Sequence, residues 1–355
     1  MNEKIETLRE KLKNLDLQGM IITNPVNIRY LTNINAEGVL LLTRRENVYI
    51  TDGRYMEAVN HALTIDDEII VYDVRELTKE DYENFFTFCE NVGFEETHLT
   101  YAKYKEYMHK YKINNFEETE GLLEKMRIVK KEDEVDCIKK ACIITDNCFE
   151  HLKQFIKIGM TEKEIAYEIE KFFLSNGADG LAFDTIVASG VNSSMPHAVP
   201  TDKKIEEGDP ITIDMGCKYK GYCSDMTRTV FAGYVPQFMK PVYDLVLKTQ
   251  LRVSEEMKEG ANLKIITKSV ESDFKLNGTS LIHSLGHGVG LEIHEYPYTS
   301  SKVDYLLKEN MVITNEPGIY ITGRFGVRVE DTVLITKYAS QNLTMSDKNY
   351  VIVGK

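Results

Sequence analysis

Residues 210–231 have the sequence PITIDMGCKYKGYCSDMTRTVF, in which two β-rich runs flank a short polar connection. The runs 210–216 and 221–231 predict the two strands of an antiparallel hairpin, with residues 217–220 as the connection. A connection this short can join only strands that run in opposite directions. The stretch therefore predicts antiparallel β-structure in this part of the chain.

Two acidic side chains, Asp214 and Asp225, lie on the predicted hairpin. If its turn is centred between Tyr219 and Lys220, these two residues pair directly, with Cβ atoms about 5 Å apart. Carboxylates at that separation repel each other, so the pair requires a shared proton, a bound cation, or a basic neighbour such as Arg228. The hairpin alone leaves a metal site and an ordinary salt-bridge network as alternatives.

Three of the chain's eight histidines occur within the sequence HSLGHGVGLEIHE of residues 283–295. A single histidine is often a structural residue, whereas His283, His287 and His294 occur together among glycines that let the backbone approach closely. The spacing of the first two is that of the zinc motif HExxH, but Ser284 stands where that motif needs its Glu. The cluster predicts a functional site of another type.

Two glutamates follow at places where an acid is unexpected. The sequence of residues 311–316 predicts a strand that ends at Glu316, and residues 327–335 predict one alternating strand with Arg328 and Glu330 on the same face. A carboxylate in so apolar a strand needs a partner if it is buried. Arg328, solvent or a metal ion remain open as that partner.

If they converge with one imidazole, the four carboxylates of Asp214, Asp225, Glu316 and Glu330 form a hard, oxygen-rich ligand set. Such a set suits Mn²⁺ or another divalent first-row ion better than a structural Zn²⁺. Five ligands exceed what one open catalytic ion needs, so a pair of ions about 3.5–4 Å apart is the simplest interpretation.

The length of 355 residues, with 43% hydrophobic and 28% charged residues, predicts two globular domains. We expect an α/β domain over residues 1–125 and a second domain over residues 126–355. In the first, we expect strands at 20–23, 38–43, 48–51 and 69–72 between helices near 3–14, 53–63 and 79–90. In the second, we expect a long helix to about 157, a helix from Thr161 with Glu164 in a capping box, and helices near 236–258 and 262–274.

The formal net charge of −13, from 56 acidic and 43 basic residues, argues against nucleic acid as a partner. The sequence predicts no membrane-spanning segment and no signal peptide at the N-terminus. The six cysteines form no CxxC pair, which favours reduced thiols and a cytoplasmic location. Cys217 and Cys223 lie near the predicted ligands, but buried, unreactive thiols are the more common outcome.

In their order along the chain, these motifs resemble those of the pita-bread metallopeptidases, and among them aminopeptidase P and prolidase. The N-terminal half is similar to the creatinase-like α/β domain of those enzymes, which methionine aminopeptidases lack. The resemblance implies an α+β pita-bread catalytic domain with a curved antiparallel sheet. It rests on DMG (214–216), YCSDMTRT (222–229), GHGVGLEIHE (286–295), NEPGIY (315–320) and VRVED (327–331).

The resemblance also implies a role for each ligand position. Asp214 would chelate one ion, Asp225 and Glu330 would bridge two ions, and His287 and Glu316 would complete the second. The ions would be Mn²⁺ in the first instance, with Co²⁺ or Zn²⁺ as alternatives.

The resemblance further implies that three histidines, His197, His283 and His294, line the substrate site. Arg328 would steer the bridging carboxylates. It also implies a homodimer in which the N-terminal domain restricts access to the partner's site.

The implied reaction is hydrolysis of a proline-containing peptide at the Xaa-Pro bond. His294 or His197 would donate a hydrogen bond to the developing oxyanion, and Glu316 would carry a proton to the leaving proline nitrogen. Some similar prolidases carry an Arg four residues after the position of His294, whereas this chain has Tyr298. We therefore expect aminopeptidase P-like release of the N-terminal residue, with an Xaa-Pro dipeptidase as the alternative and Arg324 as a substitute for the missing Arg.

Two further alternatives have different chemistry. Some relatives keep the pita-bread fold as non-catalytic binding modules, but they lose metal ligands, and here all five positions are filled. Creatinase uses the fold for metal-free amidine hydrolysis and lacks the acidic ligand set.

Overall fold

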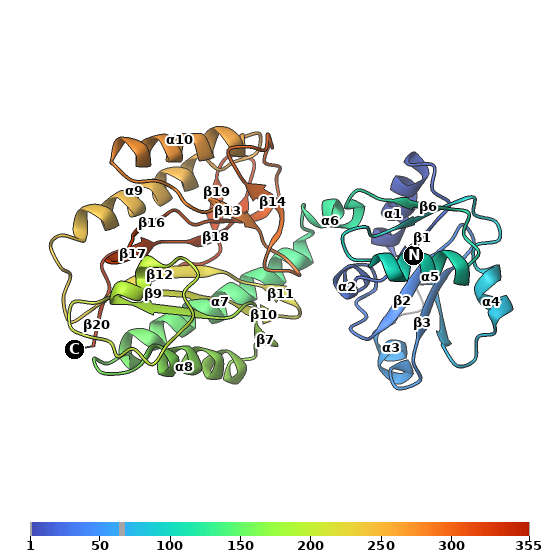
Figure 1. Ribbon diagram of the computed structural model, residues 1–355, viewed down its shortest axis with the longest axis horizontal. Helices are drawn as coiled ribbons and strands as arrows, with labels where there is room; N and C mark the ends of the chain where they lie inside the picture. The colour runs from blue at the N-terminus through green and yellow to red at the C-terminus, as the bar shows by residue number, and fades with distance from the viewer. Residues whose placement is uncertain (1, 64–67, 355) are drawn as a thin grey trace. The chain divides into compact units, whose positions relative to one another are not determined.

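The computed structural model describes residues 2–63 and 68–354, which form two compact units, Met1–Arg127 and Ile128–Lys355. Figure 1 shows the course of the chain through both. In the part of the chain that the structure describes, no helix is long and apolar enough to cross a membrane.

The first unit is built on one mixed six-stranded sheet in the order β4-β3-β2-β1-β5-β6. β2 is antiparallel to both β1 and β3, and the outer strands on either side are parallel to their neighbours. The strands are β1 (Gly19–Ile22), β2 (Gly38–Leu42), β3 (Asn47–Thr51), β4 (Ile69–Asp73), β5 (Asn91–Phe94) and β6 (Asn115–Glu118). The helices are α1 (Glu3–Asn14), α2 (Pro25–Thr32), α3 (Met56–Ala62), α4 (Lys79–Asn84), α5 (Tyr101–Lys110) and α6 (Leu122–Arg127).

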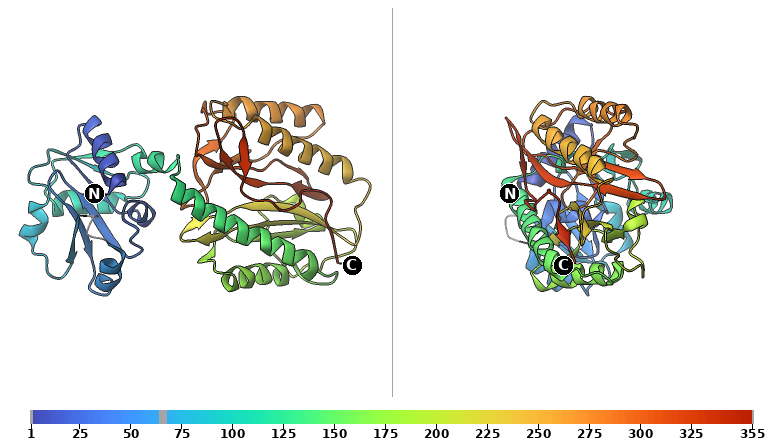
Figure 2. Two further views of the ribbon diagram at one scale, coloured as in Figure 1. Left: turned by 180° about the vertical axis from the view of Figure 1, so that it is seen from behind. Right: turned by 90° about the vertical axis from the view of Figure 1, so that its left-hand side faces the viewer.

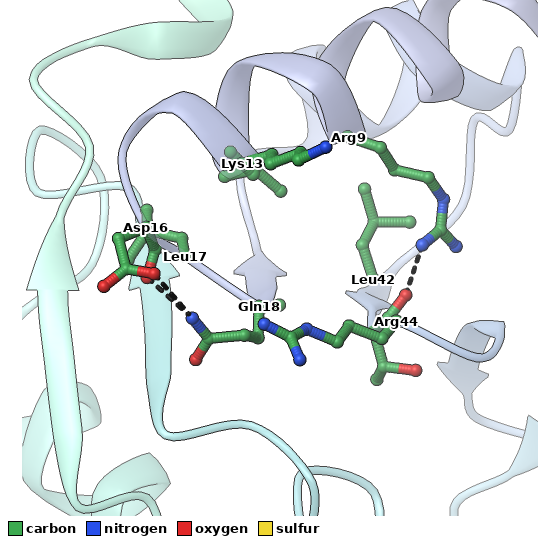
Figure 3. A pocket seen from close by; sticks show the side chains of 10 residues that line it. Arg9, Lys13, Asp16, Leu17, Gln18, Leu42 and Arg44 are labelled. Carbon is green, nitrogen blue, oxygen red and sulfur yellow. Dashed lines mark hydrogen bonds between the residues drawn. The ribbon is translucent and has the colours of Figure 1, made fainter.

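The first unit has a pocket of about 290 Å³ between the end of α1 and the strands β1 and β2 (Figure 3). Arg9 reaches from α1 to the sheet, where it donates to the carbonyl oxygen of Thr43 and to Asn47 Oδ1. The Gln18 amide donates to Asp16 on the opposite side. The pocket is thus a gap between a helix end and a sheet, which the hydrogen bonds of Arg9 join on one side.

In the second unit, antiparallel sheets lie between two pairs of helices, with α9 and α10 on one side and α7 and α8 on the other (Figures 1 and 2). The helices are α7 (Glu132–Phe155), α8 (Glu162–Ser175), α9 (Lys240–Glu256) and α10 (Leu263–Leu276), with a 3₁₀ helix η2 (Gly190–Ser194). The main sheets have the orders β20-β12-β9-β8 and β14-β13-β15-β18-β19, and β11-β10-β7 and β16-β17 form two smaller ones. The one parallel pairing among these described strands joins β12 to β20.

The strands of the second unit fall in two groups along the chain, because α9 and α10 lie in the connection between β12 and β13. They are β7 (Gly180–Leu181), β8 (Ile186–Ser189), β9 (Pro210–Met215), β10 (Cys217–Tyr219), β11 (Tyr222–Cys223), β12 (Met226–Ala232), β13 (Gly286–Gly288), β14 (Glu295–Thr299), β15 (Val312–Asn315), β16 (Gly318–Ile321), β17 (Phe325–Arg328), β18 (Asp331–Ile335), β19 (Ser340–Asn342) and β20 (Ile352–Val353).

Each helix pair covers one sheet with apolar side chains. Phe149 of α7 and Phe173 of α8 pack in one cluster with Ile213 of β9. Val246 of α9 and Phe274 of α10 belong to a second cluster on the other sheet. Since burying a large apolar side chain stabilises a fold by about 1.5–3 kcal/mol, these two cores hold the sheets between the helices. The polar residues described next lie on β9 and β13 and in connections next to strand ends.

The helix from Thr161 begins as predicted. The Thr161 hydroxyl accepts a hydrogen bond from the backbone of Glu164, and the Glu164 carboxylate accepts two from Thr161, at 2.7 and 3.0 Å. This reciprocal cap satisfies amide groups that the first helical turn leaves open. The helix predicted near 79–90 is shorter, since α4 ends at Asn84.

Two predicted strand features are wrong. Asp214 pairs with Thr227 and not with Asp225, because the turn is centred on Lys220 and Gly221, which both have positive φ, at 48° and 81°. The single strand predicted over 327–335 is two strands, because β17 pairs with β16 and the chain then passes to β18 in another sheet.

Candidate metal centre

All five predicted ligand residues line one pocket of about 930 Å³ in the second unit. They come from five different places in the chain. Asp214 is on β9 and His287 is on β13, whereas Asp225, Glu316 and Glu330 lie in the connections next to strand ends. The sheets therefore bring together side chains that are more than 100 residues apart in sequence, as in Asp225 and Glu330.

The shifted hairpin register still places both aspartates on the pocket side. A shift of two residues keeps a side chain on the same face of a strand, whereas a shift of one would turn it away. Thr227, the actual partner of Asp214, donates from its hydroxyl to Glu330 Oε2 at 2.6 Å. The hairpin thus supplies two carboxylates and a hydroxyl that holds a third.

Asp225, His287 and Glu330 each offer a ligand atom within 4.8 Å of those of the other two, and all three residues are buried. His287 Nε2 lies 3.4 Å from Asp225 Oδ2 and 3.4 Å from Glu316 Oε1. Carboxylate oxygens and an imidazole nitrogen at these separations can surround a divalent ion.

Two carboxylate oxygens in this group, Asp214 Oδ1 and Asp225 Oδ1, are buried and accept no hydrogen bond from any described residue. A buried acceptor without a partner is costly unless an ion or water satisfies it. The orphaned oxygens therefore fit a site for a divalent cation.

Electrostatic repulsion acts on the same carboxylates. Burial and the neighbouring charges of Asp214 and Glu316 raise the pKa of Asp225 well above its usual range. Burial and the charge of Asp225 do the same to the pKa of Glu330. A bound divalent cation reverses this effect, because it favours the charged form of each carboxylate.

The orientation of His287 suits metal binding through Nε2. Its Nδ1 lies 3.1 Å from the carbonyl oxygen of Gly288, which can only accept, so Nδ1 carries the proton. Nε2, which faces the carboxylates, then has its lone pair available. Gly286 permits this close packing, since a Cβ there would lie 2.1 Å from the Thr314 carbonyl oxygen.

Arg328 is the partner of Asp214, and Glu330 instead accepts from Thr227. The buried guanidinium donates to Asp214 Oδ2 at 2.6 Å, to Thr227 Oγ1 at 3.0 Å and to the Tyr320 hydroxyl at 2.6 Å. It neutralises one carboxylate of the four. The other candidate partner on the hairpin, Arg228, lies elsewhere, because it donates to Asp331.

The three other predicted site histidines also line the pocket. His294 packs edge-on against His287, with ring centroids 4.4 Å apart, and His197 is exposed. Burial lowers the pKa of both His283 and His294. These two imidazoles are therefore biased toward the neutral form.

The tautomer of His283 follows from its partners. Its Nδ1 lies 2.7 Å from the Ser284 carbonyl oxygen, so Nδ1 is the donor. The Tyr320 hydroxyl, which accepts from Arg328, then donates to His283 Nε2 at 3.1 Å. Both ring nitrogens have hydrogen-bond partners, so the His283 ring is held in one orientation in the pocket lining.

Sequence reasoning missed Tyr320, Thr227 and the ion pair between Lys130 and Glu295. Tyr320 is the last residue of the NEPGIY motif, four residues after Glu316, and only the pairing of β16 with β17 brings it to Arg328. Lys130 Nζ lies 3.1 Å from Glu295 Oε2, and both side chains are almost completely buried. Glu295 also accepts from the backbone N–H of Glu292, so this pair lies directly behind the loop that carries His294.

The rest of the pocket wall is largely apolar. It includes Phe183, Ile186, Val199, Ile282 and Ile293, with Tyr298 at 45% exposure. Arg324 is not among the residues that line the pocket, and its guanidinium lies over the ring of Phe238. The expectation that Arg324 could replace a missing arginine has no support from this arrangement.

Two family models match the chain. Residues 136–337 match metallopeptidase family M24, and residues 4–129 match the creatinase/prolidase N-terminal domain. An Xaa-Pro dipeptidase of Pyrococcus horikoshii is 35% identical over 357 residues, covering 99% of each chain.

Solved structures show the same similarity along the whole chain. An Xaa-Pro dipeptidase from Bacillus anthracis is 37% identical, with a TM-score of 0.93 and 99% of each chain covered. An X-Pro aminopeptidase from Thermotoga maritima is 31% identical, with a TM-score of 0.89, and covers 97% of this chain and 100% of its own.

Proposed function

Because the chain belongs to metallopeptidase family M24 and carries a creatinase/prolidase N-terminal domain, we propose that it hydrolyses Xaa-Pro dipeptides. The family matches and the similar structures confirm three predictions from the sequence: the family, the creatinase-like plus pita-bread fold, and the class of metallopeptidase. The observation that carries the proposed metal-dependent hydrolysis is the convergence of Asp225, His287 and Glu330 in a pocket that also contains Asp214 and Glu316.

The order of the two substrate hypotheses is the reverse of the sequence-based expectation. Relatives named Xaa-Pro dipeptidase or prolidase reach 35–37% identity, whereas the X-Pro aminopeptidase named above reaches 31%. We therefore place the dipeptidase first. Aminopeptidase P-like cleavage stays the second candidate, because the half-exposed Tyr298 leaves an uncharged side chain on the pocket wall.

We propose that two divalent ions, Mn²⁺ in the first instance, bind to the five residues. Asp214 would hold one ion, Asp225 and Glu330 would bridge the two, and His287 and Glu316 would complete the second. The orphaned oxygens of Asp214 and Asp225 support this assignment. When bound, such ions lower the pKa of a coordinated water and polarise the carbonyl that it attacks.

The surrounding residues would orient the substrate and move protons. His294 and the exposed His197 would donate hydrogen bonds to the developing oxyanion. Glu316 is the candidate proton carrier, because its carboxylate lines the pocket and is 14% exposed, and Thr314 donates to it at 3.1 Å. Arg328 would keep Asp214 in place.

Two properties of the whole protein belong to this proposal. A homodimer is proposed from the resemblance, and light scattering on the purified protein tests it. A cytoplasmic location is proposed because all six cysteines are free thiols.

The direct test compares an Xaa-Pro dipeptide with an Xaa-Pro-Yaa tripeptide on protein stripped of metal and reloaded with Mn²⁺. We expect Mn²⁺-dependent release of proline from the dipeptide, at a higher kcat/KM than release of Xaa from the tripeptide. A preference for the tripeptide would favour the aminopeptidase. Hydrolysis of neither, with metal bound, would favour a non-catalytic module.

A further inference from the structure

A loop over residues 190–200 forms one wall of the pocket. It begins after Ser189, the last residue of β8, and ends at Thr201. Pro196, His197, Ala198, Val199 and Pro200 all line the pocket. The path of this loop therefore decides where the His197 imidazole lies.

Both ends of the loop are held by one buried carboxylate, Glu162, in the first turn of α8. Glu162 Oε1 accepts from the Ser189 backbone N–H at 2.7 Å and from the Ser189 hydroxyl at 2.9 Å. Oε2 accepts from the Thr201 backbone N–H at 2.9 Å and from the Thr201 hydroxyl at 2.6 Å. The Asn192 amide lies 3.1 and 3.2 Å from the two oxygens.

These contacts need a carboxylate. Glu162 is 0% exposed, and each of its oxygens accepts from donors of a different stem of the loop. An amide in its place would turn an NH₂ group toward one stem, where donors would then face a donor. Although burial raises the pKa of Glu162, the hydrogen bonds from Thr201 and Ser189 hold it below its usual value, so the charged form persists.

The middle of the loop has two weaker anchors. The Ser193 hydroxyl accepts from the Gly326 backbone N–H at 2.9 Å, and the Pro196 carbonyl oxygen accepts from Arg328 at 3.2 Å. Among the described residues, none makes a hydrogen bond to the His197 side chain that fixes the ring directly. The anchors of the loop therefore set where the backbone of His197 lies and, with it, the region of the pocket that the imidazole can reach.

We propose that Glu162 is a positioning residue that closes the two stems of the 190–200 loop and thereby places His197 for catalysis. The part that concerns catalysis rests on the proposed peptidase function. A shift of about 1 Å in a catalytic group can lower activity about 100-fold, and loss of a supporting hydrogen-bond partner about 10- to 100-fold.

The test variant is Glu162→Gln, with Glu164→Gln as the matched control. Glu164 lies on the same helix turn, but its carboxylate caps Thr161 and makes no described contact with the loop. With Mn²⁺ bound at the wild-type level, we expect kcat/KM of Glu162→Gln to fall about 10- to 100-fold. The control should stay within about twofold of the wild type.

A double-mutant cycle with His197→Ala separates positioning from a general structural role. If Glu162 acts through His197, Glu162→Gln lowers kcat/KM by less than about twofold in the His197→Ala background. An equal loss in both backgrounds overturns the proposal, as does wild-type activity of Glu162→Gln.

Amide hydrogen exchange provides a readout that needs no substrate. We expect residues 190–200 to exchange at least about tenfold faster in Glu162→Gln, because its stems are no longer closed, and to be unchanged in Glu164→Gln. Unchanged exchange overturns the proposal.

If the wild type hydrolyses no Xaa-Pro peptide while the loop loosens as expected, only the proposed function fails. If Glu162→Gln does not fold, Thr201→Val removes one donor and should give the same effects in smaller measure.

Discussion

Glu330 and Asp331 are adjacent in the chain and almost equally buried, with 2% and 0% of their surface exposed, yet their carboxylates lie in opposite electrostatic surroundings. Asp331 accepts hydrogen bonds from Arg228 and Gln250 at 2.7 Å, from Thr344 at 3.0 Å and from Lys348. Successive residues of an extended chain point to opposite sides, so Glu330 faces the pocket instead.

The pKa values diverge accordingly. Although burial raises the pKa of Asp331, Arg228 and Lys348 hold it below its usual value. Burial and repulsion from Asp225 raise the pKa of Glu330 well above its usual range. Burial alone thus does not distinguish a structural acid from a functional one. The number of hydrogen-bond donors around the carboxylate does distinguish them. Glu330, which the protein leaves short of such donors, is one of the acids proposed to bind metal.

The largest expected effect comes from Glu330→Gln. Loss of a bridging ligand should lower both metal content and hydrolysis by more than about 100-fold, beyond the loss that a supporting residue causes. The metal-free variant should be at least as stable as the metal-free wild type, because the change removes a repelling charge. Metal analysis and kcat/KM test the loss of metal and activity, and thermal unfolding tests the stability of the metal-free variant. A variant with full metal content would contradict the proposed difference between Glu330 and Asp331.

Asp331→Asn should show the reverse pattern. The change leaves the buried Arg228 without its anionic partner, and breaking a buried ion pair lowers the free energy of unfolding by about 3–5 kcal/mol. At temperatures where the variant is folded, metal content should stay near the wild-type level. Urea unfolding gives the stability change, with Glu330→Gln as the control. Equal stability of the two metal-free variants would contradict the proposed difference.

Glu95 in the first unit is an intermediate case, because neutral donors surround it. It accepts from the backbone N–H groups of Thr23 and Asn24 and from the Asn27 amide, and burial raises its pKa from 4.5 to about 7. The folded state thus binds the proton more tightly than the unfolded state. The corresponding stability is fully present below about pH 4.5 and is lost as the pH rises to about 7, in all about 3 kcal/mol.

Hydrogen exchange of the amides of β1 and β5 at several pH values measures this loss. In Glu95→Gln the decline between about pH 4.5 and about pH 7 should disappear. Glu96→Gln is the matched control, because its carboxylate accepts from Thr119 and Gly121 in a different loop. The same pH dependence in Glu95→Gln as in the wild type would refute the assignment.

The smallest expected effect is stabilisation by metal. Mn²⁺ at about 100 times its Kd should raise the free energy of unfolding of the metal-free protein by about 2.7 kcal/mol. Glu330→Gln should show none of this increase, and Asp331→Asn should show all of it. Thermal unfolding with and without Mn²⁺ makes the measurement. A metal response in Glu330→Gln would place the ion elsewhere.

Residue types and motifs predicted which residues share the pocket, but they could not predict how the strands pair. The hairpin prediction was off by two residues, because the two-residue turn has Lys220, and not the usual Asn, Asp or Gly, at its first position of positive φ, before Gly221. The two aspartates still reached the same pocket, because an even shift preserves the face.

The break between β17 and β18 illustrates a second limit. Alternation along 327–335 indicates which side each residue faces, whereas the strand partner depends on distant segments, β16 for Arg328 and β15 for Asp331. For the same reason the sequence could not assign Arg328 to Asp214, 114 residues away. The edge strand β6 was missed because, of its four residues, only Phe116 is buried.

The buried ion pair between Lys130 and Glu295 has a consequence for dissecting the protein. Lys130 is the third residue of the second unit, yet its side chain is only 2% exposed and belongs to that unit's interior. A catalytic half released by cleavage beyond Lys130 would lose the ammonium group behind the His294 loop. A cut before Ile128 keeps this ammonium group. Two truncations that begin only a few residues apart should therefore differ sharply in their free energy of unfolding.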